Sequence, residues 1–269
     1  APIPHYYPPG APYFAAVLQV LLTDDAVSAT RLAYIIALCL AGIAVYGWVS
    51  RREGAAAGVL AAFLYLYSPY IGLIAPHVLG DLPGTLALAL LPLMLWRLDS
   101  LLRNNHPSDI LLLPLAAAAL CLTDVRGFFT GLALAGLMLL HRRHEPARRY
   151  GRAAVSLSLA LGIAACFWLP ASLEQTAVQW RTPIIPAAFR LTLTELFMPA
   201  RQLDINDLAP VPQFALGIPL VLAAIIGAAA LFRFRQRRLL ATWGLLAGIS
   251  LAALALVALP QETSLLGAI

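Results

Sequence analysis

The sequence predicts an all-α fold of the polytopic helical membrane class, and three observations support this. Hydrophobic residues make up 61% of the 269 residues and charged residues 12%, whereas a soluble domain carries about 25% charged residues. Apolar stretches of about 20 residues, the length that spans a bilayer, recur along the chain. All 18 basic residues are arginines and most stand beside these stretches, so the net charge of +5 reflects membrane topology. Soluble enzymes and nucleic-acid partners are therefore excluded.

About eight membrane segments follow in chain order. Most are continuous apolar runs, one is short, and two are the arms of a hairpin. The predicted segments are 27–49, 55–75, 84–98, the two arms within 110–140, 153–170, 213–232 and 239–259.

The arginines predict the orientation and the hairpin. If Arg51 and Arg52 are cytoplasmic, residues 1–26 lie outside and the chain is cytoplasmic again at Arg97 and Arg103. The arginines within 142–152 must then be cytoplasmic too, so 110–140 has to cross twice, with Asp124 and Arg126 in its turn. Because each arm has only about 14 residues, we expect the turn to lie below the outer surface.

We expect one transmembrane domain over 1–269, with a long external loop at 171–212 that folds back on the membrane. The first residue is not methionine, and the Pro-rich opening is no signal peptide, so we also expect the chain to be part of a longer protein.

Most carboxylates fall on the predicted external side, and this is where we expect chemistry. Asp81 lies in a short turn four residues after His77, a pair that could serve as a general base or bind a metal or a polar head group. The alternative is that Asp81 caps the helix that follows. Glu174 follows the membrane helix 153–170 and either faces a lipid-borne substrate or is a solvated helix-end residue.

Asp124 and Arg126 are ionisable residues within a predicted membrane hairpin, which makes them candidates for a functional site. The alternative is a local ion pair that only closes the turn. Asp24 and Asp25 indicate first a helix cap and, more weakly, a metal site.

Three motifs together indicate a family. The segments are 5–9 (HYYPP), 65–70 (YLYSPY) leading to 80–83 (GDLP), and 167–170 (FWLP) leading to Glu174. With them the chain resembles the bacterial membrane proteins described as 6-pyruvoyl-tetrahydropterin synthase-related, which are relatives of the YfhO-like proteins and the GT-C glycosyltransferases.

This resemblance implies a GT-C-like architecture in the bacterial cytoplasmic membrane and a sugar taken from a polyprenyl-phosphate carrier outside it. It places the principal catalytic carboxylate in a first external loop, which would precede these residues. Among the acids of this chain, the external charge together with the resemblance makes Asp81, Asp124 and Glu174 the catalytic candidates. The substrate-binding candidates are His5, Tyr6, Tyr7, His77, Arg126, Arg181 and Arg190.

The chain also departs from that pattern. Gly84 stands where relatives often carry Glu, and Asp124 where they often carry His. In relatives a first helix and an acidic loop precede the Tyr-Pro-Pro segment, at which this chain begins.

Other functions stay open. A non-catalytic membrane subunit would pack against other membrane proteins and hold lipid or pigment, as runs of small residues at 55–58 and 227–230 allow. A transporter is disfavoured, since no internal repeat is found.

Membrane lipids are expected partners. No motif indicates a cofactor, and a divalent metal ion stays an alternative.

Overall fold

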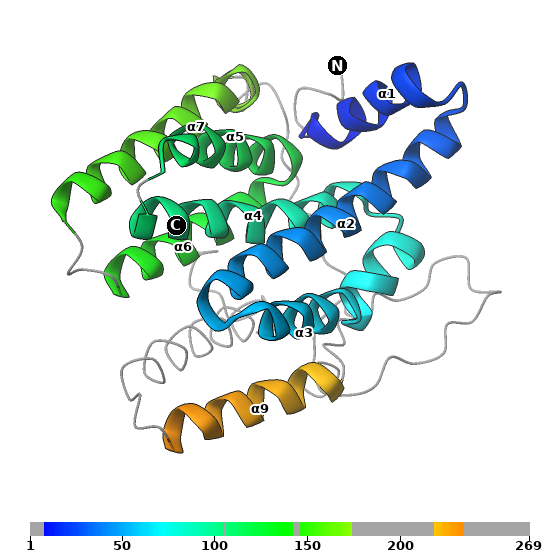
Figure 1. Cartoon of the computed structure of the whole chain (residues 1–269). Helices are drawn as coiled ribbons and strands as arrows, with labels where there is room; N and C mark the ends of the chain where they lie inside the picture. The colour runs from blue at the N-terminus through cyan, green and yellow to red at the C-terminus, as the bar shows by residue number, and fades with distance from the viewer. Residues whose placement is uncertain (1–7, 105, 142–145, 174–217, 234–269) are drawn as a thin grey trace, which may run out of the picture. The chain divides into compact units, whose positions relative to one another are not determined.

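The computed structural model confirms the all-α class (Figure 1). It describes residues 8–104, 106–141, 146–173 and 218–233, and every regular element in these ranges is helical. The elements are α1 (Gly10–Leu22), α2 (Ala26–Glu53), α3 (Ala55–Leu66), the π-helix η2 (Tyr70–Val78), α4 (Leu82–Asn104), α5 (Pro107–Thr123), α6 (Val125–His141), α7 (Ala147–Leu173) and α9 (Ile218–Arg233).

Four stretches of the described chain are long and apolar enough to cross a membrane: α2, the run Ala55–Val78, α4 and α7. The polytopic membrane class is therefore confirmed. Helices α5 and α6 are shorter, with 17 residues each, and meet at Asp124, as the predicted hairpin requires. Their arms are longer than expected, at about 25 Å each. The predicted segment at 239–259 lies outside the described residues.

The helices differ from the predicted segments in two places. Residues 1–26 contain a further short helix, α1, which is too short to span. The segment predicted at 55–75 is interrupted, because α3 ends at Leu66 and a π-helix begins at Tyr70, just after Pro69. Proline lacks the N–H that would continue the α-helical hydrogen bonds.

The chain divides into two compact units. The first comprises residues 1–67 and 71–180, and the second comprises 68–70 and 181–269. The prediction of one transmembrane domain stays a prediction. In the second unit the structure describes the helix α9.

Helix α2 organises one half of the first unit by packing against α1, α3 and α4. It can approach them closely because alanines recur at helical spacing along its buried face. This alanine stripe consists of Ala29, Ala33, Ala37, Ala41 and Ala44, each at most 1% exposed. In the other half, α5 lies between α4 and α7, around a core that includes Leu98, Leu113, Leu120 and Phe128 (Figure 1).

One close contact sets the register of α2 against α4. The ring of Trp96 in α4 lies against Gly47 of α2, where a Cβ atom would meet Cη2 of the ring at 2.5 Å. One turn further along α2, the Arg51 guanidinium stands over the same ring, 5.0 Å from its centroid. Gly47 therefore leaves the space that brings the last turns of α2 and α4 together.

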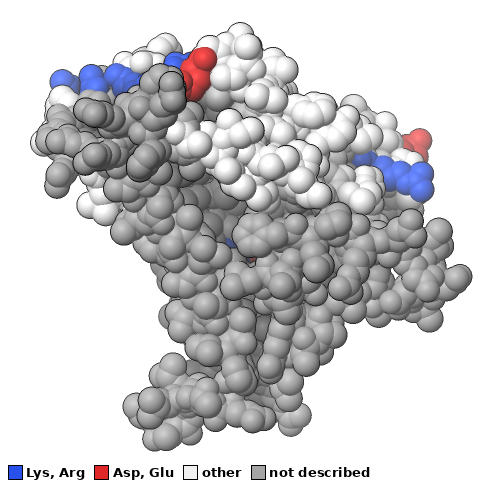
Figure 2. Space-filling view, turned by 90° about the horizontal axis from the view of Figure 1, so that it is seen from below, with Lys and Arg blue, Asp and Glu red and all other residues white. Residues whose placement is uncertain are grey.

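Charged side chains are confined to the ends of these helices. Figure 2 shows blue and red side chains at two opposite edges of the visible face, and the described surface between them is white. Many large apolar side chains between the ends are exposed, among them Ile35, Ile43, Phe63 and Val155. An uncharged belt with exposed apolar residues is what a protein embedded in a bilayer presents to lipid.

We predict that Gly47→Ala lowers stability by about 1–3 kcal/mol, because the added methyl group displaces the Trp96 ring from a packed site. Thermal unfolding of the detergent-solubilised protein measures this. Gly162→Ala in α7 is the matched control, since its Cβ would meet no atom within 4 Å. Equal melting temperatures for the two variants would contradict the proposed role of Gly47.

Candidate functional site

The charged residues of the first unit separate into two groups. The acid end consists of Asp24, Asp25, Asp81 and Asp124, at or beside the starts of α2, α4 and α6. The arginine end consists of Arg51, Arg52, Arg97, Arg103 and Arg149, together with the buried Asp99 and Asp109. The sequence predicted chemistry at the acid end.

Asp81 caps the start of α4. Its Oδ1 accepts a hydrogen bond from the Gly84 backbone N–H at 2.9 Å, and its own carbonyl accepts two from Thr85, through N–H and Oγ1. The preceding Gly80 has φ +59°, the left-handed conformation that lets the chain turn from η2 into α4. The carboxylate is half-buried and makes one of the roughly four contacts it can accept. Asp81 therefore caps the helix, and its carboxylate can still accept further hydrogen bonds.

The small residue at position 84 is part of this geometry. A side chain on Gly84 would collide with Oδ2 of Asp81, so a glycine at this position makes room for the carboxylate. His77 lies in η2 and is exposed, and no hydrogen bond joins it to Asp81 within the described residues. Joint action of His77 and Asp81 on a metal or a polar head group stays a prediction.

Asp124 caps α6. Its two carboxylate oxygens accept hydrogen bonds from the backbone N–H groups of Arg126, at 3.1 Å, and Gly127, at 3.0 Å. The structure gives no ion pair between Asp124 and the Arg126 guanidinium, so the local ion pair is replaced by a backbone cap. The Arg126 side chain is exposed beside this turn. A carboxylate at a helix start is favoured by the helix dipole as well as by the two N–H donors.

Close contacts bring the hairpin turn to α1 and α4. A Cβ on Gly10, the first residue of α1, would lie 2.7 Å from the Leu122 carbonyl oxygen, and one on Gly127 would lie 3.2 Å from the Ala87 Cβ. Ala87 is in the sixth position of α4 and Gly127 in the third of α6. The start of α6 is therefore packed against the second turn of α4. That the hairpin turn lies below the outer membrane surface stays a prediction.

Asp25 is a cap, and the described residues do not form a metal centre. Its Oδ2 accepts hydrogen bonds from the Ser28 N–H and Oγ, both at 2.9 Å. The backbone N–H of Ser28 holds the pKa of this carboxyl below its usual value of 3.8. Asp24 is exposed beside it. Within the described ranges no three His, Cys, Asp or Glu side chains gather where they could hold a metal ion. The metal alternative stays a prediction.

Several predicted site residues lie outside the described residues. They are Glu174, His5, Tyr6, Tyr7, Arg181 and Arg190, and the predicted loop 171–212 falls mostly there too.

The acid end offers two half-exposed carboxylates on neighbouring helices, each held in place by backbone N–H groups. Asp81 and Asp124 retain lone pairs that can accept a proton from a hydroxyl group. The exposed guanidinium of Arg126, two residues after Asp124, can bind a phosphate through its N–H fork. This combination suits transfer chemistry between a hydroxyl acceptor and a phosphate-linked donor.

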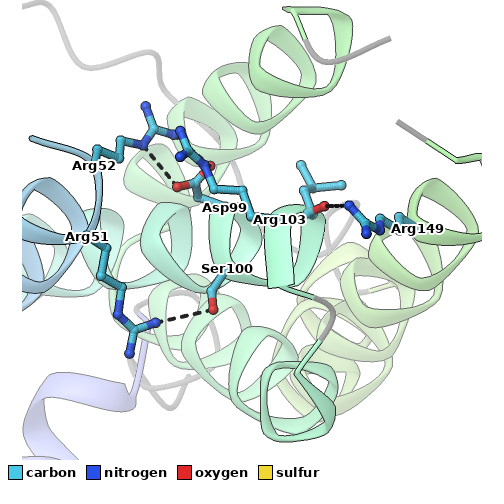
Figure 3. A network of polar contacts seen from close by, with 7 residues as sticks. Arg51, Arg52, Asp99, Ser100, Arg103 and Arg149 are labelled. Atoms are coloured by element: carbon cyan, nitrogen blue, oxygen red, sulfur yellow. Dashed lines mark hydrogen bonds and ion pairs between the residues drawn. The ribbon is translucent and has the colours of Figure 1, made fainter. Parts of the chain in front are cut away.

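Sequence reasoning did not single out the arginine end, yet two acids are buried there. Asp99 bonds to Arg52 and Arg103 (Figure 3), and Asp109 lies 3.4 Å from Nη1 of Arg97. The sequence does carry a signal for this cluster of buried acids. Two aspartates stand in a region otherwise populated by arginines, and Arg103 follows Asp99 by one helical turn. Arg149 adds a hydrogen bond to the Leu102 carbonyl at 2.7 Å, which caps the last turn of α4.

The model of one family, described as "6-pyruvoyl-tetrahydropterin synthase related domain; membrane protein", matches residues 5–265. A search of curated proteins and a search of solved structures gave no match.

We predict that Asp124→Ala lowers stability by about 1 kcal/mol, because two backbone N–H groups at the start of α6 lose their acceptor. Asp124→Asn should retain most of the stability, since Asn is an equally good cap. Unfolding midpoints of the two purified variants measure the difference. A midpoint for the Asn variant as low as that of the Ala variant would contradict the capping role.

Proposed function

We propose a catalytic function for this chain, which belongs to the 6-pyruvoyl-tetrahydropterin synthase related family of membrane proteins. The proposed function is glycosyl transfer of the GT-C type, with a polyprenyl-phosphate-linked sugar as donor. In this proposal the acid end faces the extracytoplasmic side of the bacterial cytoplasmic membrane. The arginine end faces the cytoplasm, as the preference of arginines for cytoplasmic loops indicates.

The observation that carries the proposal is the pair of aspartates at the starts of α4 and α6. Both carboxylates are half-buried and oriented by backbone hydrogen bonds, and Gly127 against Ala87 brings the two helices together. Carboxylates fixed in this way need no reorganisation when they take a proton. A hairpin turn below the outer surface, as the short arms predict, would let a lipid carrier present its phosphate at the level of the membrane surface.

The proposed reaction has three parts. The acceptor hydroxyl oxygen attacks the anomeric carbon of the donor sugar, and its proton passes to the carboxylate of Asp81 or Asp124. The bond between the anomeric carbon and the carrier phosphate breaks, and the electron pair leaves on the phosphate oxygen. The exposed Arg126 guanidinium stabilises the negative charge of that phosphate. Glu174 is the third candidate for the base.

We predict that Asp81→Asn or Asp124→Asn lowers turnover of a lipid-linked sugar by about 10²- to 10⁴-fold, the contribution typical of a general base. Asparagine preserves the helix cap but accepts no proton at neutral pH, so the loss reports chemistry and not folding. Glu174→Gln completes the set. The assay is consumption of the lipid-linked sugar by the full-length protein in membranes.

Glu53→Gln is the matched control, because it removes an exposed carboxylate at the end of α2, away from the acid end. It should leave turnover unchanged. Unchanged turnover in all three acid variants would contradict the proposed function.

A non-catalytic membrane subunit is the second candidate, and one observation favours it. Asp81, Asp124 and Asp25 are all engaged as helix caps, a role that requires no substrate. Under this alternative the purified protein would carry a stoichiometric membrane partner and no bound polyprenyl phosphate. Mass spectrometry of the gently solubilised protein distinguishes the two candidates.

A further inference from the structure

The last residues of α2 hold α4 from two sides (Figure 3). Arg52 extends to one side, where its Nε and Nη2 atoms contact the Asp99 carboxylate at 3.0 and 2.6 Å. Arg51 extends to the other side, where it reaches Ser100 at 3.3 Å and stacks on Trp96. Two adjacent arginines thus occupy different surroundings.

Asp99 also contacts a second arginine on its own helix. Nε of Arg103, one turn later, lies 3.3 Å from Oδ1 of Asp99. The Asp99 side chain is only 6% exposed, whereas those of Arg52 and Arg103 are 26% and 42% exposed. One buried carboxylate therefore holds two guanidinium groups that reach the surface.

This arrangement keeps an excess of positive charge in a fixed place. In these contacts of the described residues, Asp99 sets one negative charge against the two positive charges of Arg52 and Arg103, and Nη1 and Nη2 of Arg103 are not used in its contact with Asp99. Two guanidinium groups oriented by a common anchor lose little side-chain freedom when they bind a further anion. The oxygens of a phosphate match the guanidinium fork, and phosphate is the anion that lipid headgroups carry.

The position of these arginines selects a lipid as the source of the phosphate. They stand at the ends of two helices long and apolar enough to span a membrane, where lipid headgroups lie. Between the ends of α2 and α3, exposed apolar side chains such as Ile43, Val59 and Leu60 offer contacts for acyl chains. A free phosphate ion would gain nothing from them.

We propose that Arg52 and Arg103, oriented by Asp99, form a binding site for the phosphate of an anionic lipid headgroup in the adjacent leaflet. The site lies at the arginine end, at the opposite ends of α2 and α4 from the acid end. It stands independently of glycosyl transfer. Its consequence is that anionic lipid fixes the depth of α2 and α4 in the bilayer, beyond the general attraction of a basic surface.

The test uses the full chain in nanodiscs of phosphatidylcholine doped with phosphatidylglycerol, and native mass spectrometry counts the lipids that the protein retains. The unmodified protein should retain phosphatidylglycerol in preference to phosphatidylcholine. Arg103→Gln should weaken this retention about tenfold, as expected for the loss of a charge-assisted hydrogen bond. Arg103→Lys should restore it only in part, because lysine keeps the charge without the fork.

Arg51→Gln is the matched control, with the same loss of charge at the same helix end but on the other side of α4. It should retain phosphatidylglycerol nearly as the unmodified protein does. Equal losses in the Arg51 and Arg103 variants, or no preference for phosphatidylglycerol in the unmodified protein, would overturn the proposal. Displacement of phosphatidylglycerol by inorganic phosphate would also overturn it, in favour of a free-phosphate site.

Because Arg52 still pairs with Asp99 in the Arg103 variants, these should fold. A thermal unfolding midpoint close to that of the unmodified protein verifies this. If Arg103→Gln fails to fold, the partial loss in Arg103→Lys still decides the question, and unchanged retention in that variant would count against the site.

Discussion

Helix ends within a membrane must satisfy their own backbone groups, because hydrocarbon offers no water to do so, and much of this structure follows from that constraint. Every described aspartate at the acid end except Asp24 accepts a hydrogen bond from a backbone N–H group at a helix start. At the other end, Arg149 donates to a carbonyl in the last turn of α4. In a chain with few charged residues, the charges are therefore used first where helices begin and end.

The same constraint explains which parts of the fold the sequence could predict. The arginines flanking 110–140 required an even number of crossings, and α5 and α6 meet at Asp124 accordingly. Hydropathy could not predict the interruption after Leu66, because apolar residues continue through Tyr70–Val78 while the hydrogen-bonding pattern changes. Hydropathy also predicted no membrane span at α1. This helix is too short to span and packs its Ala11 and Leu18 against α2 and α4.

The sequence could predict where the acid end lies, but not the hydrogen bonds that orient its carboxylates. The predicted excess of acids on the external side identified Asp81 and Asp124. The hydrogen-bond partners depend on the local backbone: Gly84 donates to Asp81, and Arg126 and Gly127 donate to Asp124. The Arg52 contact with Asp99 was out of reach for a different reason. It joins residues 47 positions apart, and it depends on the register between α2 and α4 that Trp96 sets by packing on Gly47.

Burial separates the two kinds of carboxylate in this protein. The side chains of Asp99 and Asp109 are at most 6% exposed and lie against guanidinium groups, so their charge is committed to holding helices together. Breaking such a buried pair is costly, because one charge is then left without a partner. Asp81 and Asp124 are half-buried and rest on backbone N–H groups, which remain in place whatever else the carboxylates bind. A reaction that needs a proton acceptor can therefore use the acid end without unlocking the helix packing, and the arginine end can hold the bundle in place meanwhile.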